Sequence, residues 1–207
     1  MKVTKEQILR ASLAYFASHD YEGVSLNDIA GTLNITKGGI YHYFRSKDEL
    51  FRDAVIYVMD QMEHSLDQEA FSSMEPKDIL ELFFDVETFS SSYYEALGID
   101  ILKDYKSVVY LVFTAMKKFP EVEEKIRASY IGITQAIEYF FRAAAAEGKI
   151  RKDLDYGAIS YLLSAYIEGG MLLSAVGANE GGQEMNVRVF NFFWSILIGE
   201  NSKGVIV

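Results

Sequence analysis

The stretch from Val24 to Leu50, VSLNDIAGTLNITKGGIYHYFRSKDEL, decides the fold. It predicts two short helices joined by a tight turn, because apolar residues recur at helical spacing on either side of a polar break. Ser25 can cap the first helix, and Asp28 follows three residues later, much as in a capping box. Asn34 stands where this helix must end, since asparagine tolerates the left-handed conformation that is common at helix C-termini.

The second helix of the pair, predicted over residues 37–44 with Thr36 as its cap, carries groups suited to nucleic acid. Lys37 brings a charge to a helix start, where free N–H groups already attract phosphate. Gly38 and Gly39 each cost about 1 kcal/mol relative to alanine inside a helix. Missing side chains would let the backbone approach the floor of a DNA major groove. Three flat side chains that can donate hydrogen bonds to phosphate follow, namely Tyr41, His42 and Tyr43.

These residues resemble the DNA-binding head of the TetR family of bacterial transcriptional regulators. The resemblance rests on Ser25 to Ala30, Thr36 to Phe44 and Ser46 to Leu50, and it covers about the first quarter of the chain. Asn34 stands where the family usually has glycine, and Gly39 where threonine, serine or alanine is commoner. Helix-turn-helix geometry also occurs in domains that do not bind DNA. The expected DNA-binding residues are Ser25, Asn27, Thr36, Lys37, Gly38, Gly39, Tyr41, His42, Tyr43 and Lys47.

The net charge of −10 is unexpected for a protein that binds nucleic acid, but the acidity lies outside this head. Residues 1–52 hold seven Lys or Arg against six Asp or Glu, whereas residues 53–207 hold thirteen against twenty-four. Binding to phosphate is local and depends on a few well-placed cations. The chain has no cysteine, which excludes disulfides and thiolate metal sites.

The rest of the sequence predicts an all-α fold of about nine helices. We expect a first helix over residues 4–18 and a fourth, capped by Ser46, that runs to about residue 69. Pro76 and Pro120 suit the first position of helices, Gly148 suits a helix end, and Asp153 or Asp155 suits the next cap. The later helices are expected over residues 76–92, 98–118, 120–147, 154–178 and 183–199. We predict a helix-turn-helix domain over residues 1–47 and a helical ligand-binding and dimerisation domain over residues 48–207.

The second domain is rich in aromatic side chains and predicts a binding cavity. Its tyrosines are too numerous for a dry core, because each buried hydroxyl needs a hydrogen-bond partner. A helical cavity lined by rings and a few hydroxyls is typical of small-molecule sites, although plain core packing remains the alternative for any single residue. A cationic ligand would need a carboxylate from Glu87, Glu138 or Glu168. The expected wall residues are Phe84, Tyr110, Phe113, Tyr139 and Tyr166.

The last two helices carry features of a subunit interface. Small residues on the first would permit close helix approach, and the second has an apolar stripe. Packing of the final helix within its own chain would use the same stripe. The family resemblance implies a homodimer, and the expected interface residues are Ala165, Gly169, Phe190, Phe193, Trp194 and Leu197.

No enzymatic activity, metal site or cofactor is expected, since the three histidines show no metal-ligand spacing and no nucleotide or hydrolase motif is present. No apolar run reaches the length of a membrane span, and no secretion signal is visible, which favours a cytoplasmic protein. We expect a homodimeric transcriptional repressor that leaves its operator DNA when a small apolar or aromatic effector binds. The alternatives are a small-molecule-binding enzyme and a protein–protein adaptor that carry a helix-turn-helix head.

Overall fold

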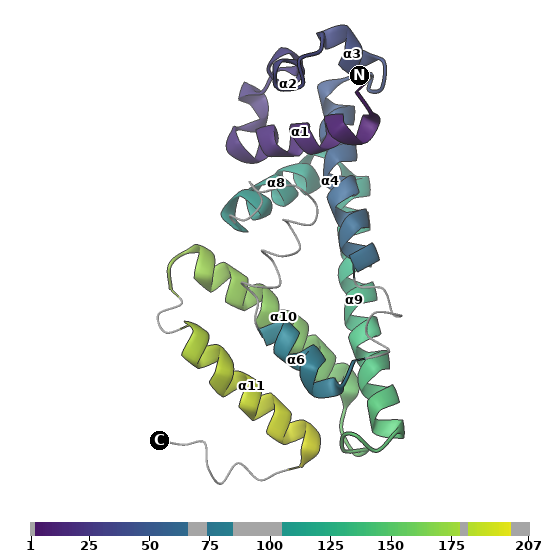
Figure 1. Ribbon diagram of the computed structural model, residues 1–207, viewed down its shortest axis with the longest axis vertical. Helices are drawn as coiled ribbons and strands as arrows, with labels where there is room; N and C mark the ends of the chain where they lie inside the picture. The colour runs from purple at the N-terminus through teal and green to yellow at the C-terminus, as the bar shows by residue number, and fades with distance from the viewer. Residues whose placement is uncertain (1–2, 66–73, 85–104, 179–181, 200–207) are drawn as a thin grey trace. The chain divides into compact units, whose positions relative to one another are not determined.

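The computed structural model describes residues 3–65, 74–84, 105–178 and 182–199. All regular secondary structure in these ranges is helical, which confirms the predicted all-α fold (Figure 1). The chain forms two compact units. Unit 1 comprises Met1–Ser65 and Ser91–Ser129, and unit 2 comprises Leu66–Ser90 and Tyr130–Val207. Our division by function, at residues 47 and 48, stays a prediction.

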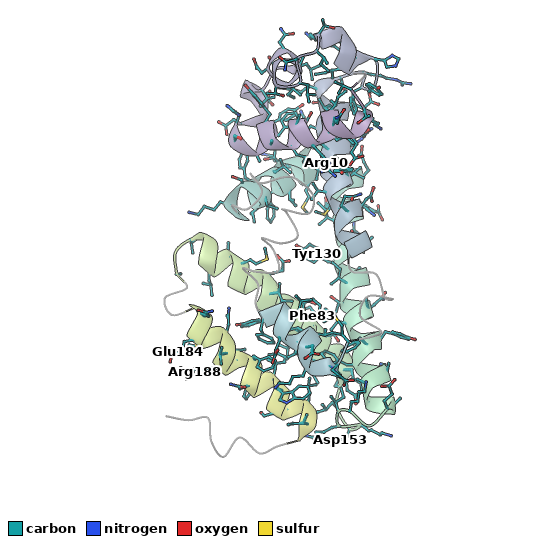
Figure 2. All side chains as sticks on the ribbon, viewed as in Figure 1. Arg10, Phe83, Tyr130, Asp153, Glu184 and Arg188 are labelled. Atoms are coloured by element: carbon teal, nitrogen blue, oxygen red, sulfur yellow. The ribbon has the colours of Figure 1, made fainter. Side chains whose placement is uncertain are left out.

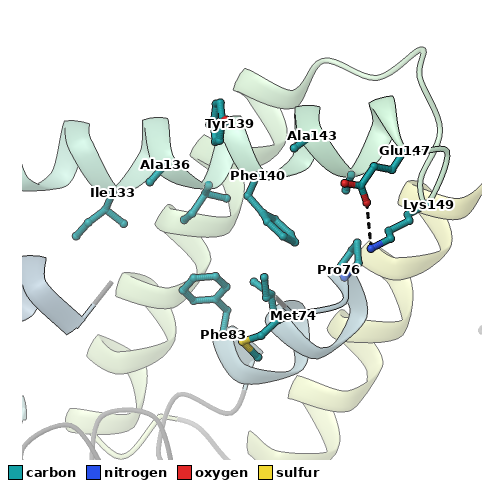
Figure 3. A pocket seen from close by; sticks show the side chains of 13 residues that line it. Met74, Pro76, Phe83, Ile133, Ala136, Tyr139, Phe140, Ala143, Glu147 and Lys149 are labelled. Atoms are coloured by element: carbon teal, nitrogen blue, oxygen red, sulfur yellow. Dashed lines mark ion pairs between the residues drawn. The ribbon is translucent and has the colours of Figure 1, made fainter. Parts of the chain in front are cut away.

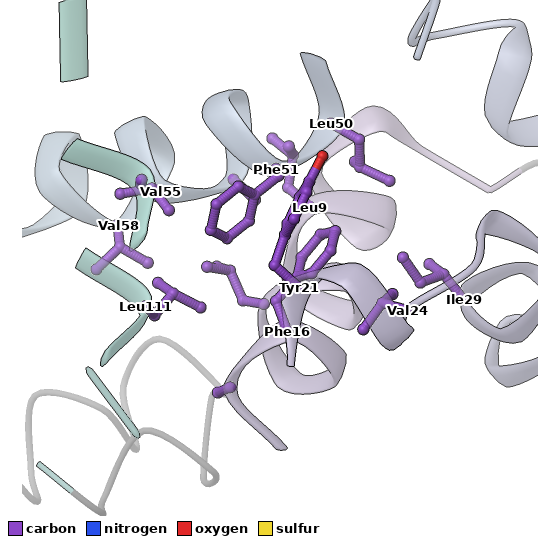
Figure 4. Close-up of a cluster of buried hydrophobic side chains, with 14 of the residues drawn as sticks. Leu9, Phe16, Tyr21, Val24, Ile29, Leu50, Phe51, Val55, Val58 and Leu111 are labelled. Carbon is purple, nitrogen blue, oxygen red and sulfur yellow. The ribbon is translucent and has the colours of Figure 1, made fainter. Parts of the chain in front are cut away.

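Unit 1 contains the predicted head. Its elements are α1 (Lys5–Ser18), the 3-10 turn η1 (Tyr21–Gly23), α2 (Leu26–Thr32), α3 (Lys37–Tyr41), α4 (Lys47–Ser65), α8 (Tyr105–Lys118) and the first part of α9 (Pro120–Ala146). One apolar core joins them, in which Phe16 and Phe51 are almost fully buried with ring centroids 4.7 Å apart (Figure 4). Leu111 of α8 belongs to the same core. The head is therefore packed directly against α8.

The predicted helix caps of the head are confirmed. The Thr4 side chain accepts the Gln7 amide, the Ser25 side chain accepts the Asp28 amide, and both caps form complete capping boxes. The Ser46 hydroxyl accepts the amide of Glu49 at 3.0 Å at the start of α4. These local bonds satisfy amides that the helices leave without partners.

The predicted end of the third helix is wrong, because α3 ends at Tyr41 rather than at Phe44. The Tyr43 amide donates to the carbonyl of Ile40 at 2.9 Å, which tightens the last turn. Two tertiary contacts explain the early end. Phe44 is 1% exposed in the core, and the Tyr43 hydroxyl donates to the Val3 carbonyl at 2.9 Å. Helical periodicity alone does not report such contacts.

The turn between α2 and α3 depends on Asn34, whose φ of 52° lies in the left-handed region. A residue with a β-carbon and no local polar group pays about 1–2 kcal/mol in this conformation. We expect Asn34→Ala to lower the free energy of unfolding by about 1 kcal/mol, and Asn34→Gly to leave it unchanged or higher. Urea unfolding followed by circular dichroism measures both, and equal stability of the two variants would contradict the turn geometry.

Unit 2 contains α6 (Pro76–Phe84), the remainder of α9, α10 (Tyr156–Ala175) and α11 (Gly182–Ile198). Both prolines begin helices, as predicted. Gly148 ends the chain's longest described helix with a φ of 79°, and Asp155 caps α10 by accepting the Ala158 amide at 3.0 Å. The predicted parts of helices over residues 66–69, 85–92 and 98–104 lie outside the described residues.

Phe84 of α6 holds α10 and α11 together. Its ring centroid lies 4.7 Å from that of Tyr166 on α10 and 5.5 Å from that of Phe193 on α11. The Tyr166 hydroxyl donates to the Asn186 side chain at 2.7 Å, which joins the two helices a second time. On the outer side of α11, Glu184 and Arg188 are exposed, whereas Phe83 of α6 is buried (Figure 2).

Candidate nucleic-acid interface and candidate ligand cavity

The exposed side of α3 presents one cation that the fold leaves available. Lys37 is exposed, and its ammonium lies 5.6 Å from the centroid of the Tyr41 ring, which is itself 48% exposed. Among the residues that the structure describes, no carboxylate lies within ion-pair distance of Lys37. A cation without a carboxylate partner can pair with an external anion such as phosphate, and no internal ion pair has to break first.

In the described part of the chain, neither space nor backbone conformation requires the two glycines of α3 to be glycine. A β-carbon added at Gly38 would meet only the Thr36 hydroxyl, at 3.6 Å, and one at Gly39 would touch only the Ile35 side chain, at 3.4 Å or more. Both distances are ordinary contacts, and neither glycine has a positive φ. Packing and backbone conformation would therefore accept alanine, which is the better helix former. Nothing among the described residues therefore requires glycine at either position.

Three of the predicted DNA-binding side chains already serve the fold. The Thr36 hydroxyl accepts the Gly39 amide at 3.3 Å as the cap of α3. The Ser25 hydroxyl donates to Asp28 at 2.6 Å, and the Tyr43 hydroxyl donates to the Val3 carbonyl. Asn27 and His42 are exposed.

Lys47 is the clearest case of a predicted contact that is used inside the head. Its ammonium donates to the carbonyls of Tyr21 at 2.8 Å and Val24 at 3.0 Å, and it lies 4.3 Å from the centroid of the Tyr21 ring. The Tyr21 hydroxyl in turn donates to Asp48, and this hydrogen bond lowers the pKa of the Asp48 carboxyl. Burial and the same carboxylate raise the pKa of the Tyr21 phenol. Lys47 thus ties η1 to the start of α4.

Sequence reasoning missed Arg45, which lies between α3 and α4. Its side chain is exposed and, in the described ranges, outside any ion pair. Its amide donates to Glu49 at 2.6 Å, so the backbone that carries it is fixed. The sequence signal that could have identified it is a basic residue directly after the predicted DNA-binding helix.

Unit 2 contains a cavity of about 200 Å³ between α6 and α9 (Figure 3). Its lower wall in that view includes Met74, Pro76 and Phe83, and its upper wall comes from residues of α9 that include Ile133, Ala136 and Phe140. Ile79 of α6 also lines the cavity. The lining is mainly apolar. One end is charged, because Glu147 and Lys149 line it and form an ion pair at 3.1 Å.

Lys149 also bonds Glu75, which precedes α6, at 3.0 Å. The hydrogen bonds that Glu75 and Glu147 accept raise the pKa of the Lys149 ammonium. Lys149 is therefore shared between Glu147, which lines the cavity, and Glu75, which lies next to the lining residues Met74 and Pro76 in the chain. Together these three side chains carry a net negative charge. All three side chains are accessible to solvent.

The structure does not bring the five predicted wall residues together. Tyr139 lines the cavity and is 64% exposed at its rim. Phe84 and Tyr166 belong to the same unit but pack against each other, with tilted rings, and do not line this cavity. Tyr110 and Phe113 lie on α8 in unit 1, at 47% and 64% exposure. The candidate carboxylates Glu138 and Glu168 do not line it, and Glu87 lies outside the described residues.

The six predicted interface residues fall into two groups. Phe190 and Leu197 are 8% and 0% exposed within a single chain, and Phe193 and Trp194 pack against the same core. Ala165 and Gly169 instead lie on a side of α10 that keeps apolar surface accessible. Large apolar side chains exposed on α10 and α11 include Leu162, Leu172, Leu173, Met185 and Phe192, and Val176 directly after α10 is exposed as well.

No group of histidine, aspartate and glutamate side chains in the described ranges is arranged to hold a metal ion. None of the described helices combines the length and the apolar character that crossing a bilayer requires.

Comparison with known proteins identifies relatives of the head and of the whole chain. Residues 8–54 match the family model described as bacterial regulatory proteins of the tetR family. The chain is 24% identical over 172 residues to YxaF, an uncharacterized HTH-type transcriptional regulator of Bacillus subtilis, covering 83% of this chain and 84% of YxaF. It is 28% identical over 88 residues to IcaR, a negative transcriptional regulator of the icaADBC biofilm operon in Staphylococcus aureus, covering 40% of this chain and only 47% of IcaR.

Solved structures share the fold over nearly the whole chain. A transcriptional regulator from Saccharomonospora viridis in complex with choline has a TM-score of 0.69 at 20% identity, covering 91% of this chain and 94% of that one. AibR in complex with isovaleryl coenzyme A and operator DNA has a TM-score of 0.58 at 19% identity, covering 94% and 98%. At these identities the likeness is one of fold.

Proposed function

Because this chain is a transcriptional regulator of the TetR family, we propose that it acts as a homodimeric repressor. In this proposal α2 and α3 bind operator DNA, and a small apolar or aromatic effector that binds in unit 2 causes release. The cytoplasm, where operator DNA lies, is its proposed location.

The observation that carries the DNA-binding proposal is the combination of Lys37, Gly38 and Gly39 on one short exposed helix. Lys37 has no carboxylate partner in the described ranges, and neither glycine is required by internal packing. A bare backbone beside an available cation suits close approach to a groove lined with phosphates. We propose direct contacts from Lys37, Gly38, Gly39, Tyr41 and His42, with Arg45 at the adjacent backbone. Ser25, Asn27, Thr36, Tyr43 and Lys47 complete the proposed surface, largely by fixing its shape.

A dimer would place two copies of α3 on one operator. Two recognition helices read successive major grooves when they lie about 34–36 Å apart. The exposed apolar side chains of α10 and α11, together with Ala165 and Gly169, support these helices as the interface. Large apolar surface that stays accessible in one subunit is typical of a protein–protein contact.

The effector would bind in the cavity between α6 and α9. A ligand releases DNA only if it prefers the conformation that does not bind the operator. Solved proteins of the same fold were crystallised with choline or isovaleryl coenzyme A, which makes a small-molecule effector a reasonable proposal here. The negative regulator IcaR supports repression as the output. An enzyme or an adaptor is less well supported, because the relatives are transcriptional regulators.

The test is fluorescence anisotropy with labelled DNA from the region beside the protein's own gene, with a shuffled duplex as control. Specific binding in the nanomolar range, weakened by salt, is expected. Equal affinity for both duplexes, or affinity that does not change with salt, would overturn the DNA-binding proposal.

Lys37 and Lys47 provide a matched pair of variants. We expect Lys37→Ala to weaken binding to every duplex and to lower the slope of log K against log salt by about 1, because one phosphate contact is lost. Lys47→Ala should instead lower the melting temperature, because its carbonyl partners are left unsatisfied, and should leave the salt slope of the folded protein unchanged. If Lys47→Ala lowers the salt slope and Lys37→Ala lowers the melting temperature, Lys47 rather than Lys37 contacts phosphate.

A further inference from the structure

The cavity between α6 and α9 is large enough for a small organic molecule. An apolar cavity of about 150 Å³ holds benzene, and this one has a volume of about 200 Å³. A single ring with a short chain, or a short branched chain, would therefore fill it. Phe83 and Phe140 face each other across its interior (Figure 3).

At the charged end of the cavity, the ammonium of Lys149 is shared between the lining residue Glu147 and Glu75, which lies outside the lining. Lys149 bonds Glu147 at 3.1 Å and Glu75 at 3.0 Å, so two carboxylates share one ammonium. The C-terminal end of α9 adds partial negative charge close to Glu147. The partial positive charge at the start of α6 is already matched by Asp78 in its first turn.

We propose that the cavity binds a small amphiphile that carries a protonated amine, with its apolar part between α6 and α9 and its ammonium at Glu147. An anion drawn to Lys149 would lie beside two carboxylates and would be repelled by them. A cation would be attracted by these carboxylates, and the faces of nearby aromatic rings also attract it. The inference rests on the proposed function in one respect, namely that this ligand is the effector.

The ligand's ammonium would compete with Lys149 for Glu147, the partner that lines the cavity. Lys149 now joins the residue before α6 to the residue after α9, through Glu75 and Glu147. Taking Glu147 from Lys149 weakens this connection between α6 and α9. The ligand would thereby change the contact between the two walls of its own site.

The test uses three probes with the same apolar part, 3-phenylpropylamine, 3-phenylpropanol and 3-phenylpropanoate, titrated calorimetrically into the full chain. The amine should bind about fivefold more tightly than the alcohol, the value of one exposed ion pair, and the acid should bind most weakly. Glu147→Gln should remove the preference for the amine and leave the alcohol unaffected. Lys149→Met should strengthen binding of the amine. Glu123→Gln, an equal change of charge on α9 outside the cavity, is the control.

Ala136→Phe, which fills the cavity, should abolish binding of all three probes. Ala143→Leu, seven residues further along α9, is a second filling variant if the first fails to fold. Unchanged amine affinity in a folded filling variant, preference for the acid, or no binding of any probe would overturn the inference. DNA release is measured separately. Amine binding without release would overturn the effector role alone, whereas release by the alcohol or acid without amine preference would overturn only the inference.

Discussion

Gly38→Val is expected to abolish specific operator binding while the protein stays folded. A β-carbon at this position meets only the Thr36 hydroxyl, at 3.6 Å, which is an ordinary contact, so the first atom of the new side chain fits within the chain. On the outer side, the added methyl groups would stand between α3 and the groove floor. The affinity should fall to that of non-specific DNA, which is about a thousandfold or more weaker than specific binding. Anisotropy measures the loss, and circular dichroism checks the fold.

Gly38→Ala refines this prediction, because stability and binding should change in opposite directions. Alanine favours the helix by up to about 1 kcal/mol, so the melting temperature should not fall, whereas operator affinity should. Gly132→Val on α9 is the matched control, since a β-carbon there meets nothing within 4 Å. Nanomolar operator binding by Gly38→Val would show that α3 does not approach DNA through this glycine.

The sequence predicted those parts of the fold that depend on local chemistry. Thr4, Ser25 and Ser46 cap their helices as expected, and Asn34 and Gly148 adopt positive φ where helices end. Each of these features depends on hydrogen bonds or backbone angles within a few residues. They can be predicted from the sequence because they need no partner that is distant in the chain.

Features that depend on distant contacts were not predictable in the same way. The early end of α3 follows from Phe44 entering the core and from Tyr43 reaching Val3, forty residues away. Lys47 resembles a surface cation in the sequence, yet carbonyls of η1 hold its ammonium. Spacing gives the face of a helix on which a side chain lies, but not what that face meets.

The aromatic residues of the second domain show the same limit. Composition favoured a cavity in the helical body, and one is present between α6 and α9. It could not assign Tyr110 to unit 1, where its hydroxyl donates to Asp20 at 3.0 Å. Nor could it indicate that the charged end would come from Glu147 and Lys149, which follow α9.

The second large effect is expected for Phe192→Glu on α11, which should prevent dimerisation. Phe192 is 54% exposed, on the side opposite the buried Phe190. In the proposed dimer a glutamate there would bury an unpaired charge in each subunit, which costs about 3 kcal/mol or more. The dimer dissociation constant should rise at least about a hundredfold, and the variant should sediment as a folded monomer. Operator affinity should fall with it, because a monomer occupies one half-site.

Two further variants separate assembly from folding. Ile131→Glu places the same charge at a side chain of equal accessibility on α9, at 53%, and should remain dimeric. Trp194→Glu should instead lower the free energy of unfolding, because Trp194 packs against the core of its own chain. Fluorescence of the single tryptophan follows both processes in the other variants. If Phe192→Glu dimerises with unchanged affinity, the interface does not lie on this side of α11. If Trp194→Glu is stable but monomeric, the interface lies instead on the stripe formed by Phe190, Phe193, Trp194 and Leu197.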